Sequence, residues 1–290
     1  MATKQSASKT QEISLAHSPD SDDAFMFYAL ATRKVRTPGL KFTHVLSDIE
    51  TLNQEAKKEK YDVTAVSFYA SAFLQKNYML LDCGASFGDG YGPTLVALHP
   101  MKRKELAGKR VAVAGMLTTS YLALKLYEPG IEPVVVPFDK ITAAVTAGTV
   151  DVGLLIHEGQ LLYQQAGLHR VADLGQWWGE ETGMPLPLGG NMIRRALGPE
   201  VGRAVAKAIR QSVTYALEHR EDALKYALQF ARDMDPELAD KFVGMYVNQW
   251  TLGFGEKGRS AVRELLSRGA KAGLLPVGGA DVDFLSETHT

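Results

Sequence analysis

The stretch "DVGLLIHEGQ", residues 151–160, places a histidine and a glutamate directly after a run of apolar residues. Such a run is typical of a strand buried on both faces, so we expect a strand over 151–157. Polar residues at the carboxyl end of a strand lie where open α/β sheets bind ligands. An imidazole there can accept a proton near neutral pH with little adjustment of its pKa. His157 is therefore a candidate general base, with a structural histidine as the alternative, and Glu158 is a lesser candidate for orienting its ring.

A second candidate site lies in "GKRVAVAGMLTTSYLALKLY", which predicts a strand over 110–114, a turn and then a helix. Thr118, Thr119 or Ser120 can cap that helix with its hydroxyl oxygen. The free backbone amides and the helix dipole at this end favour a bound carboxylate or phosphate. Two interpretations fit these residues. In the first, the threonines only cap the helix; in the second, one threonine caps the helix while the other faces a ligand.

An acidic cluster follows the first predicted strand in "HSPDSDDAFMFYAL". Ser21, Asp22 or Asp23 can cap the helix expected over 22–33. The spacing of Asp20, Asp22 and Asp23 matches no calcium loop, and no histidine cluster completes a transition-metal set, so we expect no metal. We interpret these carboxylates as complements to the helix dipole, with one member lining a cleft.

Two further stretches resemble ligand motifs only in their letters. "GFGEKG" (253–258) fits GxGxxG but follows a helical segment, not a strand, so we interpret it as a loop between helices and expect no cofactor. "QWWGEETGMPLPLGGN" (176–191) has no clear period. Its residues Trp177 and Trp178 fit two interpretations, contact with an aromatic ligand and packing at an interface between lobes.

The elements that position these residues predict an α/β protein with largely parallel sheets, because strand-like and helical patterns alternate through the first two-thirds of the chain. Beyond Pro199 the period is helical. The expected strands are "ISLAHS", "KFTHVL", "YDVTAVSF", "YMLLDCG", "PTLVALH", "KRVAVAG", "EPVVVPF" and "VDVGLLI", and the expected later helices span 199–218, 221–232, 236–249 and 257–271.

A faint internal repeat suggests two similar lobes. In both units a short helix leads to an Asp-Val pair and then to a strand, over 62–68 and 151–157. This arrangement places Ser67 and His157 at strand ends on the two walls of one groove. We expect a disordered leader over 1–12. We expect one lobe from 13–97 plus 193–290 and a second from 98–192, with crossings near 96–100 and 191–195.

Composition excludes some classes of partner. The formal net charge of -1 gives no electrostatic reason to expect nucleic acid or an anionic membrane surface. No apolar run approaches the roughly 20 residues of a spanning helix, and the start lacks the apolar segment of a secretory signal. The single cysteine, Cys83, excludes an internal disulfide. We therefore expect a cytoplasmic protein, and nothing in the sequence indicates its oligomeric state.

Five stretches, in order and at nearly constant spacing, resemble the 1,4-dihydroxy-6-naphthoate synthase family of the futalosine route to menaquinone. They are "DIETLNQEA", "GYGPTLVA", "VAVAGMLTTSYLALKLY", "GLLIHEGQ" and "DLGQWWGEETGMPLPLG". The resemblance runs from about Leu15 to Leu197 and more loosely through the helical tail. It implies a two-lobed fold like that of type II periplasmic binding proteins. It also implies a lyase without metal or cofactor that splits cyclic dehypoxanthine futalosine into 1,4-dihydroxy-6-naphthoate and a sugar fragment.

The resemblance also assigns roles to residues. The histidine of "LIHE" is the family's proton acceptor, which makes His157 the base. The substrate, a carboxylated aromatic compound derived from a nucleoside, would contact the residues that match the family's binding segments, namely Ala65, Val66, Ser67, Thr118 and Thr119.

Two features depart from the family pattern. Ala65 stands where family members carry a lysine, and "SPDSDD" (18–23) replaces Ser-Pro-Cys-Pro-Asn-Asp. Both changes make the site more negative, which disfavours an anionic substrate group beside them. Two alternatives stay open: the sibling enzyme chorismate dehydratase on the same fold, and a cytoplasmic protein that binds a small anionic aromatic compound without chemistry.

Overall fold

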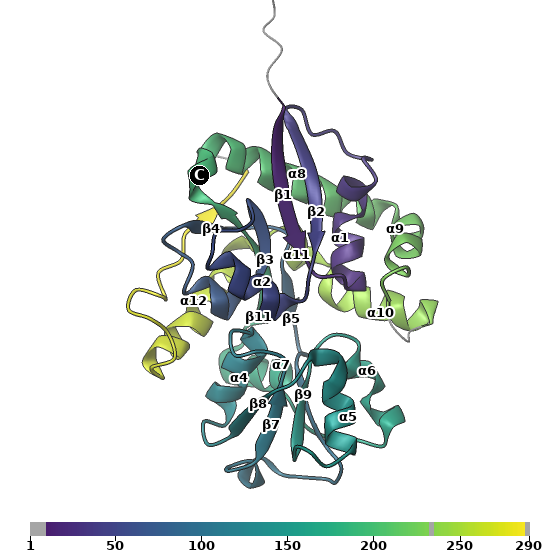
Figure 1. Ribbon diagram of the computed structural model, residues 1–290, viewed down its shortest axis with the longest axis vertical. Coiled ribbons are helices and arrows are strands. Elements are labelled where there is room, and N and C mark those ends of the chain that lie inside the picture. The colour runs from purple at the N-terminus through teal and green to yellow at the C-terminus, as the bar shows by residue number, and fades with distance from the viewer. Residues whose placement is uncertain (1–9, 232–234, 288–290) are drawn as a thin grey trace, which may run out of the picture.

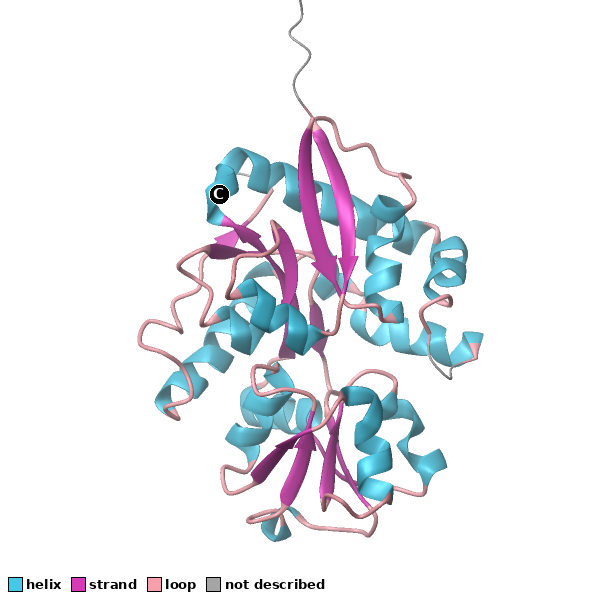
Figure 2. Cartoon of the chain, viewed as in Figure 1, coloured by secondary structure: helices cyan, strands magenta, loops and turns pink. Residues whose placement is uncertain are grey.

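The chain forms two β-sheets flanked by helices in the computed structural model, which describes residues 10–231 and 235–287. Figure 1 shows the larger sheet and its helices above and the smaller sheet below, and Figure 2 distinguishes strands from helices by colour. The first strand begins at Gln11, so the described end of the expected leader belongs to the sheet. Residues 1–9 of that leader lie outside the described residues.

The larger sheet has seven strands in the order β12-β4-β11-β3-β1-β2, with β5 paired to β11. The strands β2, β1 and β3 run parallel, whereas β11 runs antiparallel to β3, β4 and β5. Their bounds are β1 Gln11–His17, β2 Leu40–Leu46, β3 Val63–Ser67, β4 Tyr78–Leu81, β5 Ser86–Gly88, β11 Leu186–Arg194 and β12 Phe284–Leu285.

The smaller sheet has five strands in the order β10-β6-β9-β7-β8. The strand β7 runs parallel to both β8 and β9, and β6 runs antiparallel to β9 and β10. Their bounds are β6 Thr94–Ala97, β7 Arg110–Val113, β8 Glu132–Val135, β9 Val152–Leu155 and β10 His169–Asp173.

The chain passes between the sheets earlier than we expected. It leaves the larger sheet after Gly88 and returns to that sheet at Leu186. The crossings that we expected near 96–100 and 191–195 are therefore not the points where the chain passes from one sheet to the other. All four residues of the strand at 94–97 are buried, and a fully buried apolar strand can belong to either sheet, so its sequence did not indicate which sheet it joins. In β11 a Cβ on Gly190 would lie 3.0 Å from the Phe68 ring, so this glycine, in a stretch without a clear period, serves close packing. The division into lobes at 97/98 and 192/193 stays a prediction.

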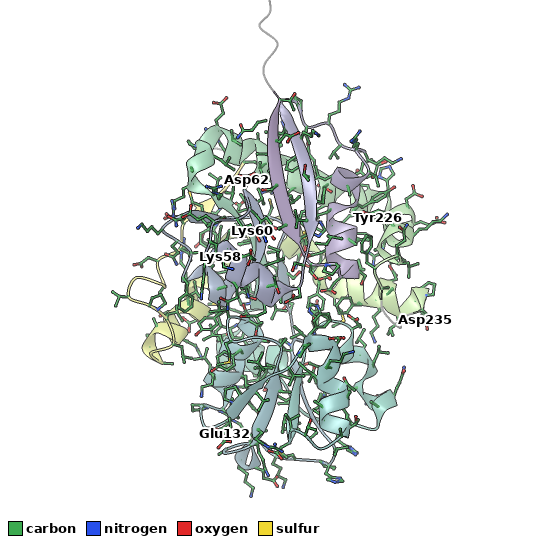
Figure 3. The ribbon with its side chains drawn as sticks, in the orientation of Figure 1. Lys58, Lys60, Asp62, Glu132, Tyr226 and Asp235 are labelled. Atoms are coloured by element: carbon green, nitrogen blue, oxygen red, sulfur yellow. The ribbon has the colours of Figure 1, made fainter. Side chains whose placement is uncertain are left out.

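The two aspartates of the internal repeat make equivalent contacts. Asp62, which is labelled in Figure 3, lies at the entrance of β3. Its Oδ2 accepts a hydrogen bond of 2.9 Å from the backbone N–H of Ser14, on the parallel neighbour of β3. Asp151 Oδ2 accepts one of 2.8 Å from the backbone N–H of Arg110, on the parallel neighbour of β9. Each aspartate thus fixes the entrance of one strand against the next, at the end opposite to Ser67 and His157.

The helices cover both sheets, and two large clusters of buried side chains fill the layers. The long helix α8 and the shorter α9 pack against α1. No helix in the described ranges is both long and apolar enough to cross a membrane. The bounds are α1 Ser21–Ala31, α2 Ile49–Ala56, α3 Phe68–Ser71, α4 Thr119–Tyr127, α5 Ile141–Thr146, α6 Gly159–Leu162, α7 Leu174–Thr182, α8 Gly198–Glu218, α9 Arg220–Ala227, α10 Pro236–Tyr246, α11 Gln249–Leu252 and α12 Gly255–Lys271.

The stretch 253–258 is mostly the first turn of a helix, so its interpretation as a loop is wrong beyond Phe254. The helix α12 begins at Gly255. A Cβ on Gly258 would lie 2.9 Å from the Cβ of Phe254, so this glycine permits local packing. The helix pattern was obscured because three glycines lower helix propensity in this stretch.

The tryptophan-rich stretch forms α7, which the sequence pattern did not predict. The side chain of Asp173 caps this helix by accepting from the backbone N–H groups of Gly175 and Gln176. Trp178 is fully buried, and its indole N–H donates to the Pro185 carbonyl oxygen. The Trp177 ring packs edge-on against the Tyr127 ring. Both tryptophans therefore serve packing and stand away from the cavity described below.

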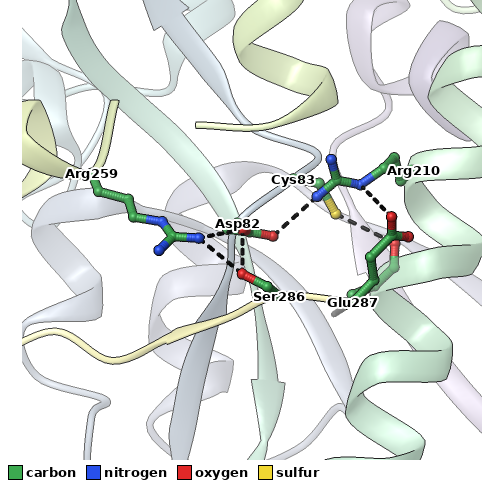
Figure 4. Close-up of polar contacts among 7 residues, drawn as sticks. Asp82, Cys83, Arg210, Arg259, Ser286 and Glu287 are labelled. Atoms are coloured by element: carbon green, nitrogen blue, oxygen red, sulfur yellow. Dashed lines mark hydrogen bonds and ion pairs between the residues drawn. The ribbon is translucent and has the colours of Figure 1, made fainter. Parts of the chain in front are cut away.

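A polar cluster fixes the end of the chain beside β4 (Figure 4). Asp82 accepts hydrogen bonds from the guanidinium groups of Arg210 and Arg259 and from the hydroxyl of Ser286. Because Ser286 follows β12, these contacts hold the last described segment on the edge of the larger sheet. Asp82 is separated by one residue from Gly84, which lines the cavity.

Candidate active site

A cavity lies between the carboxyl ends of the two sheets and contains about 800 Å³ of space not filled by atoms, its open mouth included. The larger sheet and its helices contribute residues between 18 and 26, the end of β3, β11 and α10. The smaller sheet contributes the start of α4 and the turn after β9. The groove predicted from the repeat is therefore present.

The structure brings all of the predicted site residues to this cavity. Ala65, Val66 and Ser67 form the end of β3, and Thr118 and Thr119 lie at the start of α4. The turn after β9 brings His157 to the same space. Their roles in binding and catalysis stay predictions, because position alone does not show what a residue does.

His157 lies in a turn beyond the strand, not on the strand as we expected. The strand β9 ends at Leu155, and His157 has a φ of 59°, in the left-handed region that non-glycine residues rarely adopt. Such a conformation costs on the order of 1–3 kcal/mol and persists where the surrounding structure imposes it, often at functional sites. The ring packs edge-on against the Phe138 ring, with 4.9 Å between centroids.

The partner of the imidazole is Asp20, not the neighbouring Glu158. His157 Nδ1 lies 2.9 Å from Asp20 Oδ2, and the side chains of both residues are largely buried. Asp20 also accepts a hydrogen bond from the Ser18 hydroxyl. This pairing holds the ring direction and leaves Nε2 as the nitrogen that can exchange a proton with a ligand.

The acidic cluster caps α1 differently from our expectation. Asp20 occupies the N-cap position without a side-chain capping bond, while Ser21, Asp22 and Asp23 lie inside the first turn. Asp23 Oδ2 accepts from the backbone N–H of Ser18 at 2.8 Å. All three carboxylates line the cavity. In the described part of the chain, no group of three or more His, Cys, Asp or Glu side chains is arranged to hold a metal ion.

These carboxylates change the proton affinity of His157. Burial by itself lowers its pKa, but the charges of Asp20, Asp22 and Glu158 and the hydrogen bond to Asp20 outweigh burial and raise the pKa to about 9. Burial and the charge of Asp20 raise the pKa of Asp22 to about 6. This direction differs from our expectation of a neutral imidazole needing little adjustment, because a raised pKa favours an imidazolium paired with Asp20 at neutral pH.

Stability should therefore depend on pH through His157. Its folded pKa of about 9 exceeds the ordinary 6.5, so the stabilisation is complete below pH 6.5 and is lost as pH rises through 9. The shift corresponds to on the order of 3 kcal/mol. We expect the free energy of unfolding of the wild type to fall, relative to that of His157→Gln, between about pH 7 and about pH 9.5. Urea titrations at both pH values measure this difference, and parallel changes in the two proteins would contradict it.

The threonine pair divides its tasks. Thr118 caps α4 by accepting from the Tyr121 N–H at 3.2 Å, as both of our interpretations required. Its own hydrogen goes to the Gly115 carbonyl, and the Thr119 hydroxyl donates to the Leu188 carbonyl at 2.6 Å. Both hydroxyl hydrogens therefore already form hydrogen bonds within the protein. An anion at this end would depend on the free backbone amides of the first turn of α4.

Ser67 faces the same end of the cavity and is held by a residue we did not predict. The fully buried Asn53 accepts from the Ser67 N–H at 2.9 Å and donates to the Ser67 hydroxyl at 3.1 Å. Because Ser67 Oγ accepts this bond, its hydrogen can be donated to a ligand. Asn53 lies on α2, within the "DIETLNQEA" stretch that carried part of the resemblance.

Comparison with known proteins supplies the remaining observation. A family described as menaquinone biosynthesis matches residues 13–271, which is most of the chain. The chain belongs to this menaquinone-biosynthesis family. One relative, the 1,4-dihydroxy-6-naphthoate synthase of Thermus thermophilus, is 42% identical over 264 residues, which cover 91% of this chain and 96% of the relative.

Solved structures show the fold of this family member. Protein AF1704 of Archaeoglobus fulgidus is 46% identical, with a TM-score of 0.88 over 91% of this chain and 98% of that one. A Candida albicans protein with the generic periplasmic binding protein fold is 14% identical, with a TM-score of 0.70 over 97% of this chain and 98% of that one. These similarities confirm the fold class and the family predicted from the sequence.

In this member of the menaquinone-biosynthesis family, the two sequence departures lie in the cavity wall. Ala65 is buried, and its methyl group adds no charge at the end of β3. The "SPDSDD" segment supplies the partner of His157 and two further carboxylates. The negative charge is therefore concentrated beside the imidazole, whereas the amides of α4 provide the favourable seat for an anion.

Proposed function

We propose that this protein is a 1,4-dihydroxy-6-naphthoate synthase working in the cytoplasm. It would be a lyase that splits cyclic dehypoxanthine futalosine into 1,4-dihydroxy-6-naphthoate and a sugar fragment. Membership of the menaquinone-biosynthesis family and the name of the Thermus relative support the reaction. The observation that carries the proposal is the pair formed by His157 and Asp20 in the cavity wall, 2.9 Å apart.

In the proposed mechanism, His157 Nε2 takes a proton from a substrate carbon that a neighbouring carbonyl makes acidic. The electrons of that C–H bond form a C=C double bond while the bond to the departing sugar fragment breaks, so that the fragment leaves with the electron pair and the bicyclic product becomes aromatic. The Asp20 carboxylate stabilises the imidazolium that forms, because it is already hydrogen-bonded to the other ring nitrogen. A closed cavity excludes water and aligns the imidazole with the carbon.

Turnover by the purified protein tests this proposal. We expect incubation with cyclic dehypoxanthine futalosine to yield 1,4-dihydroxy-6-naphthoate, detected by chromatography and mass spectrometry. Turnover of chorismate instead would indicate the sibling dehydratase. Tight binding of aromatic carboxylates without product over long incubation would indicate a binding protein and would contradict the proposed chemistry.

Ser67→Ala should weaken substrate binding more than catalysis. The substitution removes one hydroxyl donor at the anion end, and a hydrogen bond to a charged group contributes about 1.5–3 kcal/mol. We expect KM to rise by about tenfold or more, with kcat within about threefold of the wild type. Steady-state kinetics measure both constants. An unchanged KM would show that the substrate carboxylate does not reach the end of β3.

A further inference from the structure

Gln160 contacts His157 on both sides of its backbone. The backbone N–H of Gln160 donates to the His157 carbonyl oxygen at 3.2 Å. When the Gln160 amide is assigned so that its donors face acceptors, its side-chain oxygen accepts from the His157 N–H, also at 3.2 Å. These two bonds enclose the residue whose φ is 59°, so the left-handed turn is held by a side chain three positions later.

Other elements fix the amide of Gln160 in turn. In the same assignment its NH₂ group donates to the Gly92 carbonyl at 2.7 Å and to Tyr246 Oη at 2.8 Å, whereas with oxygen and nitrogen exchanged the Tyr246 hydroxyl donates to Gln160 Oε1. Gly92 lies in the segment that passes between the sheets, and Tyr246 is the last residue of α10. The turn after β9 is therefore tied to a helix packed beside the larger sheet.

Tyr246 is a rigid anchor for this chain of hydrogen bonds. Its side chain is buried, and its ring packs edge-on between those of Tyr91 and Phe242, with centroids 5.8 and 5.2 Å away. Burial raises the pKa of its phenol far above the usual range, so the hydroxyl stays protonated at working pH. Tyr246 therefore can hold Gln160 in place but is a poor proton donor or acceptor.

We propose that Gln160 and Tyr246 are positioning residues that hold His157 against Asp20 and direct its ring toward the substrate. This inference rests on the proposed function only for its effect on turnover. The hydrogen bonds themselves predict an effect on His157 in the empty protein. The charged groups that face the ring are Asp20, Asp22 and Asp23 from the start of α1 and Glu158 from its own turn. All four stay unchanged in the variants below.

The test uses Tyr246→Phe, which removes only the phenol oxygen. We expect kcat to fall by about tenfold with KM within about twofold, because the base is displaced while the anion end of the cavity at β3 and α4 is unchanged. The control is Tyr78→Phe, which removes an equally buried hydroxyl whose bond to the Tyr61 carbonyl lies away from the cavity. This control should keep wild-type kinetics. An equal loss in both variants would indicate general destabilisation and overturn the proposal.

A second readout requires no substrate. NMR titration of the His157 ring in the empty protein should show a lower pKa in Tyr246→Phe and in Gln160→Met than in the wild type, because the ring loses its fixed approach to Asp20. The double variant should resemble Gln160→Met alone, since Tyr246 acts through Gln160. An unchanged His157 titration, or a change in KM alone, would overturn the positioning role. A shifted titration in a protein that turns over no substrate would retain this role and reject the proposed reaction.

Discussion

Replacing His157 with alanine should reduce kcat by about 10²–10⁴-fold, the range that a positioned general base contributes. The substitution removes the ring nitrogen that takes the substrate proton and leaves Asp20 without its partner at 2.9 Å. KM should change less, since the predicted anion seat lies on the other side of the cavity. Steady-state kinetics with cyclic dehypoxanthine futalosine measure this effect.

The matched control is His169→Ala, which removes an exposed imidazole at the start of β10. It should retain full activity. Because His157→Ala removes the cationic partner of the buried Asp20 carboxylate, thermal unfolding of the variant must first show that it is folded at the assay temperature. Near-normal turnover by folded His157→Ala would exclude this residue as the base.

Asp20→Asn should produce the second large effect, a fall of about 10²-fold in the maximal kcat/KM together with a displaced pH profile. In the wild type, the base must lose a proton whose pKa is about 9, so kcat/KM should rise with pH up to that value. Asparagine keeps the shape of the side chain but removes its charge. Burial then dominates and lowers the pKa of His157, so the rising limb should move to lower pH.

Kinetics between about pH 6 and about pH 10 measure that displacement. The matched control is Asp22→Asn, which removes one charge from the same cluster without touching the hydrogen bond to His157 Nδ1. Its rising limb should move less than that of Asp20→Asn. Equal displacements in the two variants would show that charge alone, and not the bond to Asp20, controls the imidazole.

Much of the fold could be predicted from the sequence because burial leaves a clear pattern. The apolar runs that precede Ser67 and His157 predicted β3 and β9, and the Asp-Val pairs predicted their equivalent entrances. The strand β11 and the helix α7 could not be predicted in this way. Their glycines serve close approaches between elements that are distant in the sequence, such as Gly175 beside the backbone of Tyr91.

Local pattern predicted a site residue where that residue stands at or just beyond the end of its own element. Ser67, Thr118 and His157 meet this condition, and all three line the cavity. Ala65 and Val66 lie within β3 and were predicted only through the resemblance to the family. The pairing of His157 with Asp20 joins residues 137 positions apart in the sequence, and so depends on how the two sheets face each other. The contact of Gln160 with Tyr246 has the same origin. The sequence around each residue therefore could not have predicted either contact.

The most direct test of the proposed chemistry is a crystal structure of Asp20→Asn with cyclic dehypoxanthine futalosine bound, because this slow variant retains the imidazole. We expect His157 Nε2 to lie about 3–3.5 Å from the carbon that loses its proton, with the substrate carboxylate at the first turn of α4. A substrate bound with that carbon beyond reach of the ring would contradict proton transfer to His157.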